Sequence, residues 1–251
     1  MNTSEILHTV GHRPFPLPGS PWVMKQIWNH LLFAHWPLAP QILRPLLPPA
    51  LPLDLFEGQC WVSITPFYMT HVCPRGLPPL PYLSQFAEIN VRTYVLVENI
   101  PGVYFFSLDA NNPLAAWFAR LIFHLPYFVA CFCIQRKGGS FHYESQRSQP
   151  HAPCGAFSAM YRPISSVFQA QRGTLDYWLI ERYCLYTVGE QNKVFRAHIH
   201  HKPWSLQRAE AEIMHNSLAS ADGLHLPDTP PLFHYAQKQE VLVWPLHRIS
   251  Q

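Results

Sequence analysis

The sequence predicts a mainly β fold with a few helices, of the α+β class. In two segments, 60–67 and 88–97, apolar and polar side chains alternate, and both segments are rich in β-branched and aromatic residues. Both features are typical of strands. Strand-like stretches separated by Gly-Gly, Arg-Pro and Gly-Thr turns follow at 128–186, and another lies at 194–200. Because the 251 residues are 48% hydrophobic and only 13% charged, they can bury a large core. We expect a single domain over residues 22–251.

The first 21 residues are expected to form a flexible, proline-rich arm. Pro14, Pro16 and Pro18 prevent a regular hydrogen-bonded ladder and favour extended chain. They also interrupt any continuous apolar stretch, so no secretory signal is predicted and the expected compartment is the cytoplasm. Extended proline segments serve as docking strands in other proteins, which leaves a scaffold or interaction role open.

Charge and the length of apolar runs argue against two classes of partner. The chain has 18 Lys and Arg residues and 15 Asp and Glu residues. The basic residues form no run of the kind that contacts successive phosphates, so no nucleic-acid partner is expected. The longest apolar run, 121–134, is shorter than the roughly 20 residues of a membrane span. We interpret it as buried chain and expect no membrane partner.

Residues 88–97 carry the first functional clue. Because side chains alternate along a strand, one face of this segment holds Ile89, Val91, Thr93, Val95 and Val97. The opposite face presents a polar row, which consists of Glu88, Asn90, Arg92 and Tyr94. This polar row either meets water or lines a cavity. A Pro-Gly turn at 101–102 leads into a second strand at 103–108, so the two segments should pair as an antiparallel hairpin.

Two helices are predicted outside the strands. Asn112 is a good N-cap for the first helix, and the following proline fits its first turn. The apolar stripe of this helix consists of Leu114, Trp117 and Leu121 and ends before the next proline. Ser205 is a candidate N-cap for a second helix, which Gly223 would stop. The apolar face of that second helix would comprise Leu206, Ala209, Ile213 and Leu218.

No metal or cofactor site is predicted. His198 and His200 would point the same way, as zinc ligands do, but they belong to the polar face of the strand at 194–200 and we interpret them as solvated. Cys131 and Cys133 share one strand face without two further ligands nearby. All six cysteines lack CxxC spacing and are expected to be reduced core residues. No phosphate loop, dinucleotide fingerprint or Gly-x-Ser-x-Gly elbow occurs, so no cofactor is expected.

Several motifs between about residues 30 and 225 resemble those of the DUF2071 (YqjF-like) family, which is grouped with the acetoacetate decarboxylase superfamily. They are LFAHWP at 32–37, LRPLLP at 43–48, FEGQCWV at 56–62, FAEINVRTYV at 86–95, GVYFFSLDA at 102–110 and RLIFHLPY at 120–127. The resemblance implies a closed or strongly curved antiparallel β-barrel-like fold around a central cavity, and assembly of copies into a homo-oligomer. Fold alone does not determine chemistry.

The resemblance also identifies a difference from the decarboxylases. These carry a catalytic lysine after a proline, in a Gly-Arg-Glu-x-x-Gly-x-Pro-Lys stretch, where the amine forms a Schiff base with a keto acid. The comparable stretch, 119–127, has Tyr127 in place of the lysine, and a phenol cannot form an imine. Only Lys25 and Lys137 precede residue 190, and neither lies in the motif. We do not expect a Schiff-base decarboxylase.

Candidate site residues follow from the polar row and from the motifs. Glu88 is a candidate general acid or base, and Tyr127 a candidate hydrogen-bond donor to a developing oxyanion. Candidate ligand-binding residues are Arg92, Tyr94, Tyr104 and Arg120. The alternative is a purely structural ion pair of Glu88 with Arg92 or Arg120. We predict a cavity that binds a small molecule, and an enzyme acting on a small carbonyl or carboxylate compound by acid/base chemistry is the alternative.

Overall fold

The computed structural model describes residues 2–249, whose strands form one twelve-stranded sheet. In chain order the strands are β1 Met24–Leu38, β2 Cys60–Pro74, β3 Phe86–Val97, β4 Ile100–Ala110, β5 Tyr127–Lys137, β6 Ser140–Arg147, β7 Ala156–Pro163, β8 Cys184–Val188, β9 Val194–His200, β10 Leu206–Asn216, β11 Leu232–Val243 and β12 His247–Arg248. The predicted strands at 60–67 and 88–97 and their mainly β class are confirmed. The predicted hairpin is also present, since β3 pairs antiparallel with β4.

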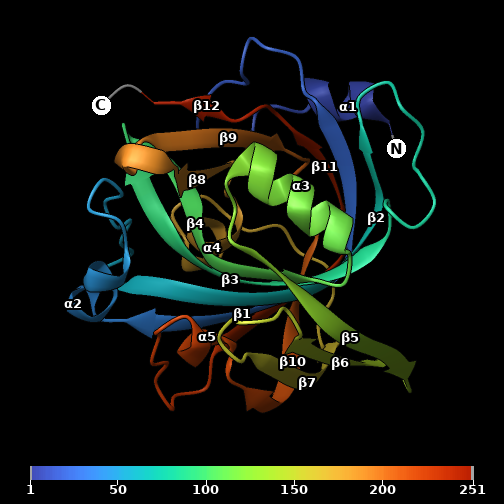
Figure 1. The fold of residues 1–251 in the computed structure, drawn as a ribbon, viewed down its shortest axis with the longest axis vertical. Helices are drawn as coiled ribbons and strands as arrows, with labels where there is room; N and C mark the ends of the chain where they lie inside the picture. The colour runs from blue at the N-terminus through green and yellow to red at the C-terminus, as the bar shows by residue number, and fades with distance from the viewer. Residues whose placement is uncertain (1, 250–251) are drawn as a thin grey trace.

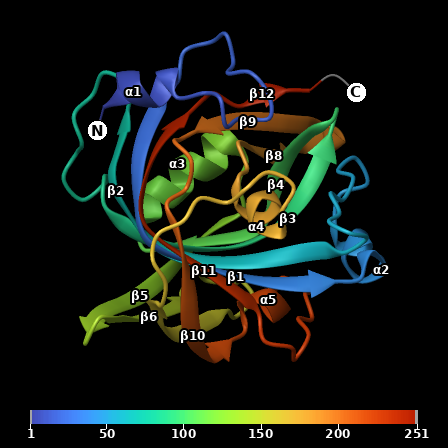
Figure 2. The same ribbon diagram turned by 180° about the vertical axis from the view of Figure 1, so that it is seen from behind.

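The sheet closes on itself twice. Its order is β12-β9-β8-β4-β3-β2-β1-β11-β10-β7-β6-β5, and a pairing between β9 and β11 closes a ring that runs through β8, β4, β3, β2 and β1. A parallel pairing between β4 and β5 closes a second ring through β6, β7 and β10. Figures 1 and 2 show the strongly curved strands from front and back. The predicted closed, curved fold is confirmed.

The strands shared by the two rings are buried on both faces. On β3, Ile89, Val91 and Val95 pack into a core with side chains of β6 and β7, such as Tyr143 and Phe157. The opposite face of β3 points into the first ring, where Phe86 and Tyr94 join a second core cluster. The polar row therefore does not face bulk water, because the first ring encloses it.

Helices make up a small part of the described chain. They are α1 Thr3–His8, α2 Pro40–Leu43, α3 Pro113–Phe123, α4 Leu175–Ile180 and α5 Leu218–Ala221, with short 3-10 turns at Arg44–Leu46 and Glu190–Asn192. The predicted helix after Asn112 is α3. The Asn112 side chain accepts a hydrogen bond from the Ala115 amide, and the helix ends at His124 in the left-handed region. Figure 1 shows α3 lying across one side of the first ring.

The helix predicted from Ser205 to Gly223 is wrong over most of its length. Residues 206–216 form β10, and only Leu218–Ala221 are helical. Ala and Glu favour helices in isolation, but Ala209, Ala211 and Ile213 alternate with glutamates, which is a strand period. Pairing of β10 with β7 and β11 overrides the local helix propensity.

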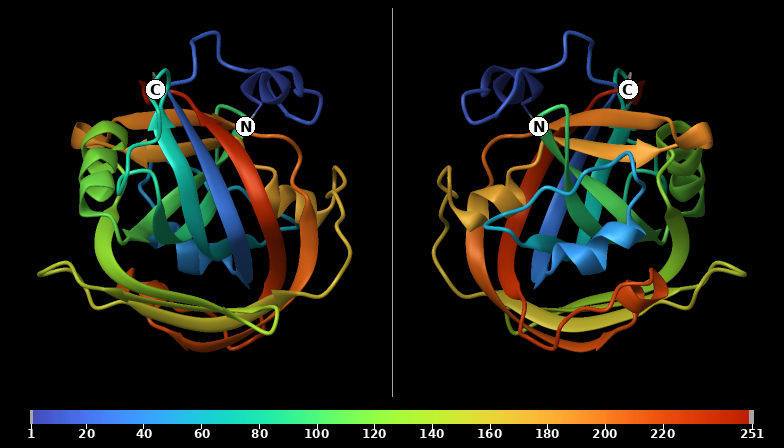
Figure 3. Two further views of the ribbon diagram at one scale, coloured as in Figure 1. Left: turned by 90° about the vertical axis from the view of Figure 1, so that its right-hand side faces the viewer. Right: turned by 90° about the vertical axis from the view of Figure 1, so that its left-hand side faces the viewer.

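The N-terminal segment packs against the first ring and is not the loose arm expected from its prolines. The Ile6 side chain is 1% exposed and packs on Leu242 and Trp244. The Arg13 guanidinium donates to the Ile199 carbonyl over 2.7 Å, and His200 Nε2 donates to the Ile6 carbonyl over 2.8 Å. Figure 3 shows α1 at the end of the molecule opposite β6 and β7.

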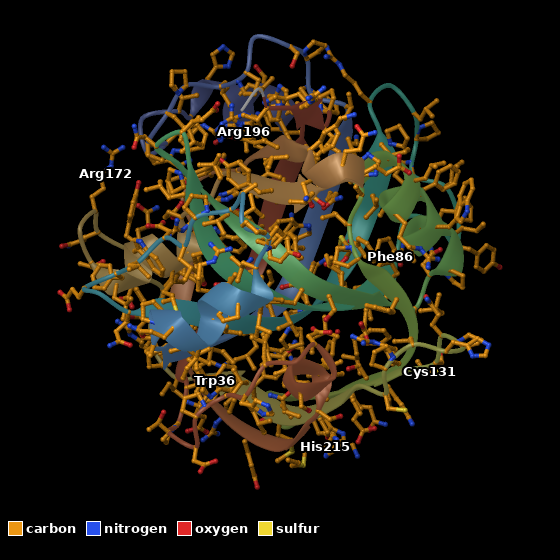
Figure 4. The ribbon with its side chains drawn as sticks, turned by 60° about the vertical axis from the view of Figure 1, so that its left-hand side comes forward. Trp36, Phe86, Cys131, Arg172, Arg196 and His215 are labelled. Atoms are coloured by element: carbon orange, nitrogen blue, oxygen red, sulfur yellow. The ribbon has the colours of Figure 1, made fainter. Side chains whose placement is uncertain are left out.

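Two further expectations about burial are wrong. Cys131 and Cys154 are exposed, although Cys60, Cys73 and Cys184 are buried. Figure 4 shows Cys131 at the periphery of the molecule. The apolar run 121–134 is likewise only partly buried, since Leu121 remains 60% exposed at the end of α3. Within residues 2–249, no helix combines the length and apolar character needed to cross a membrane.

Candidate functional site

The first ring contains a cavity of about 500 Å³. Strands β1 to β4, β8 and β9 contribute to its wall, and the inner face of α3 covers one side. Most of the lining is apolar, including Trp28, Phe67, Met69, Phe86, Phe105 and Trp204. A cavity of this volume and composition is in the range that holds a small organic ligand, about 300–1,000 Å³.

Glu88 and Tyr127 meet in this cavity, as the sequence predicts. Glu88 lies near the start of β3, opposite Ala110 of β4, while Tyr127 begins β5, which runs parallel to β4. The Tyr127 hydroxyl donates a hydrogen bond of 2.7 Å to Glu88 Oε2. Both side chains line the cavity. The β4–β5 closure therefore joins two residues that are 39 positions apart.

Burial determines the protonation behaviour of this pair. The Glu88 carboxyl is 3% exposed, and removal from water raises its pKa to about 7, although hydrogen bonds from Tyr127 and Asn90 oppose that rise. Burial, together with the neighbouring carboxylate, raises the pKa of Tyr127 well above its usual value. Tyr127 therefore stays a neutral donor, while Glu88 can gain or lose a proton near neutral pH.

Arg92 also faces the cavity but lacks a carboxylate partner. Within residues 2–249 no acidic side chain lies within 4.0 Å of it, so the alternative of a structural Glu88–Arg92 ion pair is not realised. Its guanidinium lies 5.4 Å from the centre of the Phe33 ring, and Nε has no hydrogen-bond partner. Burial lowers the pKa of Arg92 from its usual value, but a guanidinium remains protonated at any physiological pH.

Three further polar residues of the cavity were not predicted. Arg182, His201 and Trp204 line it and are each at most 5% exposed. The Arg182 Nη1 atom donates to Asp54 Oδ2 over 2.5 Å, but Nη2 has no hydrogen-bond partner among the described residues. In the same part of the chain, the ring nitrogens Nε2 of His201 and Nε1 of Trp204 also lack a partner. No sequence motif marks these positions, since only closure of the ring brings them beside β3.

Tyr94, Tyr104 and Arg120 lie close to the cavity without lining it, contrary to the prediction. Tyr94 is fully buried, and its hydroxyl is 2.6 Å from Ser63 Oγ. On β4, Val103 and Phe105 face the cavity, so Tyr104 between them points into the other core. The strand aromatics Trp61 and Phe128 are not part of its lining either.

Arg120 is directed away from the cavity because of its position on α3. Ala115, Phe118, Ala119 and Ile122 form the cavity-facing side of the helix. Arg120 lies beside them, and its Nη1 atom donates to Gln149 Oε1 over 3.2 Å. Arg120 therefore links α3 to the chain after β6.

The histidines at 198–201 are buried, contrary to the interpretation of a solvated face. The exposed fractions of His198, His200 and His201 are 7%, 0% and 0%. Burial lowers the pKa of His198 and of His201 to about 3 and that of His200 to about 4, so all three are neutral at pH 7. In the part of the chain that the structure describes, no three His, Cys, Asp or Glu side chains are grouped to hold a metal ion.

Comparison with proteins of known structure supports the architecture. The chain superposes on the enduracididine biosynthesis enzyme MppR with a TM-score of 0.66 and 13% identity, covering 92% of this chain and 89% of that one. It superposes on acetoacetate decarboxylase from Legionella pneumophila with a TM-score of 0.62 and 14% identity, covering 98% and 95%. An acetoacetate decarboxylase-like enzyme from Sphingomonas wittichii gives 0.61 and 11% identity, covering 95% and 98%. At these identities the likeness is one of fold.

Sequence comparison is more specific. The chain is 49% identical over 234 residues to the uncharacterized protein YqjF of Bacillus subtilis (strain 168), covering 93% of this chain and 96% of that one. The family model of DUF2071, described as an uncharacterized conserved protein, matches residues 25–240. The chain therefore belongs to the DUF2071 family, within an acetoacetate decarboxylase-like fold.

Proposed function

We propose that the protein binds a small organic anion with an apolar body inside the cavity of the first ring. The observation that carries the proposal is Arg92, a cation that faces an apolar cavity and has no carboxylate partner among residues 2–249. An unpaired charge in such surroundings is costly, and a ligand carboxylate would offset that cost. A guanidinium also matches a carboxylate in shape, because two parallel N–H donors meet two oxygens.

The donors around Arg92 favour the same ligand chemistry. Arg182 Nη2 and Trp204 Nε1 can only donate, and each lacks a partner in residues 2–249. A buried donor without an acceptor costs about 1–3 kcal/mol, so an acceptor-rich group is favoured there. The aromatic and aliphatic lining would accommodate the apolar body of the ligand. The fold neighbour MppR has been solved in complex with pyruvate, a small carboxylate.

Binding of matched probes tests this proposal. We expect octanoate to bind in isothermal titration calorimetry and octanol, which has the same chain without the charge, to bind at least tenfold more weakly. Arg92→Leu should remove this preference for the anion. Arg162→Leu is the matched control, because Arg162 is exposed and pairs with Glu210. Equal affinity for the two probes, or an unchanged preference in Arg92→Leu, would contradict the proposal.

Acid/base catalysis on a carbonyl compound is the second candidate, and the Glu88–Tyr127 pair favours it. Tyr127 donates to Oε2 of Glu88 and so orients the carboxyl. A carboxyl with a pKa of about 7 is suited to removing a proton from carbon beside a carbonyl group and returning it. In this role Glu88 is the base, and Tyr127 is a positioning residue.

Proton exchange at carbon tests the second candidate. With pyruvate in deuterated water, NMR should detect loss of the methyl proton signal at a rate that Glu88→Gln abolishes. Tyr127→Phe should slow the exchange and shift its pH profile, because Glu88 would lose its donor. Gln26→Leu is a control at another polar position of the lining. Exchange at the uncatalysed rate in the unmodified protein would exclude proton transfer on this probe.

We also propose that no Schiff base forms in this cavity. Among residues 2–249 none of the cavity-lining side chains is a lysine, and the motif position of the decarboxylase lysine carries Tyr127. Borohydride reduction in the presence of acetoacetate should therefore leave the intact mass of the protein unchanged. A mass increase that matches a reduced adduct on a lysine would refute this.

A further inference from the structure

One surface of the molecule carries an unusual concentration of exposed apolar side chains. Helix α3 and the loop before β3 contribute eight of them, each between 48% and 94% exposed: Leu77, Leu80, Tyr82, Leu114, Trp117, Phe118, Leu121 and Ile122. Asn112 Nδ2 donates to the Tyr82 carbonyl over 2.8 Å and so connects the loop to the start of α3. We call this set the α3 surface. The apolar stripe predicted from the sequence, Leu114, Trp117 and Leu121, is thus exposed.

The α3 surface is large enough to be an interface. Aromatic side chains present roughly 150–250 Å² each, and leucine and isoleucine somewhat less, so eight that are about half exposed present on the order of 800 Å². Monomeric proteins rarely expose continuous apolar patches above about 300–600 Å². Stable protein–protein interfaces bury about 800 Å² per partner. The α3 surface therefore matches one side of a standard interface.

We infer that the α3 surface is a self-association interface, occupied by the α3 surface of a second copy of this chain. Self-pairing requires a surface without like-charge repulsion, since a two-fold contact brings each residue near its own counterpart. The segments 77–83 and 113–123 contain one charged residue, Arg120, and it is directed to Gln149. A helix that docks on a membrane surface usually carries several Lys or Arg residues on its polar face. A second copy therefore fits better than a lipid surface.

Self-association would also affect the cavity. Leu80, Phe118 and Ile122 belong to the α3 surface and line the cavity as well, so they stand between the cavity and solvent. A partner pressed against them would cover this side and restrict entry of ligands. This consequence rests on the proposed binding function, whereas the association itself does not. The two can therefore fail separately.

Light scattering after size exclusion tests the association. We expect the unmodified protein to elute with twice the mass of the 29.0 kDa chain at micromolar concentration. The double variant Trp117→Glu/Leu121→Glu should have the monomer mass, since four charges would face one another across the two-fold axis. Neither residue lines the cavity. Ile164→Glu is the matched control, because Ile164 is 55% exposed outside the α3 surface.

Each other outcome overturns the inference. A monomeric unmodified protein would refute self-association. An assembly that persists in the double variant would show that the α3 surface is not the interface. Circular dichroism of the double variant distinguishes a lost interface from a lost fold. If it unfolds, Leu114→Gln, at the exposed first turn of α3, gives the same test with less perturbation and should weaken dimerisation at least tenfold. Co-sedimentation of a monomeric protein with anionic phospholipid vesicles, abolished by the double variant, would assign the surface to membranes.

Discussion

Two buried arginines of this protein lie in contrasting surroundings. Arg147 is completely paired, since Nε and Nη2 bond Asp109 at 2.9–3.1 Å and Nη1 donates to the Pro153 carbonyl over 3.3 Å. Arg92 faces the cavity, where Nε lacks a partner and no carboxylate lies within 4.0 Å among the described residues. In the first arrangement every guanidinium nitrogen has an acceptor inside the protein. The second leaves donor capacity for a molecule from outside.

The comparison separates a structural role from a binding role. Removal of one partner from a fully paired buried ion pair leaves an uncompensated charge and costs stability. Removal of a buried charge that has no counter-ion relieves a desolvation penalty. A binding residue should therefore be replaceable without loss of stability, whereas a structural one should not. The predictions below test this difference.

Arg147→Met should have the largest effect. Asp109 would lose its ion-pair partner, and we expect the free energy of unfolding in urea to fall by about 3–5 kcal/mol. Arg162→Met is the matched control, because Arg162 and Glu210 form an exposed pair that should contribute less than about 1 kcal/mol. A loss below 1 kcal/mol for Arg147→Met would show that the pair does not stabilise the fold.

Glu88→Gln should change how stability depends on pH. The folded pKa of Glu88, about 7, lies above the value near 4.5 of an exposed glutamate, so the folded state retains the proton longer than the unfolded state. The unmodified protein should therefore lose stability as pH rises from about 4.5 through 7, by up to about 3 kcal/mol. Glu88→Gln has no carboxyl group at this position and should not show this pH-dependent loss of stability. Urea unfolding at pH 5 and pH 8 measures it, and parallel pH profiles would contradict the raised pKa.

Arg92→Leu should leave the free energy of unfolding unchanged within about 1 kcal/mol, or increase it, because it removes an unpaired buried charge. The same variant should weaken binding of the octanoate probe at least tenfold. Thermal melts with and without the probe measure both effects. A destabilisation as large as that of Arg147→Met would mean that Arg92, like Arg147, has a structural role.

Arg120→Ala should have the smallest effect. The side chain is partly exposed and makes one hydrogen bond, to Gln149. We expect a stability change of about 0.5 kcal/mol or less, and no change in affinity for the octanoate probe. A tenfold loss of affinity would restore the original prediction that Arg120 binds the ligand.

The sequence predicted the Glu88–Tyr127 pair of the site but not the other polar residues that line the cavity. Glu88 and Tyr127 could be connected because each matches a family motif. Tyr104 was assigned to the cavity because it is a strand aromatic, but the strands shared by the two rings are buried on both faces. Alternation therefore could not reveal which face of β4 borders the cavity. Arg182, His201 and Trp204 carry no motif at all.

The sequence by itself determined the strands with a clear period of two, the hairpin of β3 and β4, the Asn112 cap of α3 and the family. These features depend on side chains close together along the chain, so local patterns are sufficient to specify them. Only the tertiary structure decided that 206–216 is a strand, which side of α3 is exposed, and which donors stay unpaired in the cavity. The physical reason is that pairing of β4 with β5 and of β9 with β11 joins distant segments, and burial, desolvation and partner choice arise only after these closures.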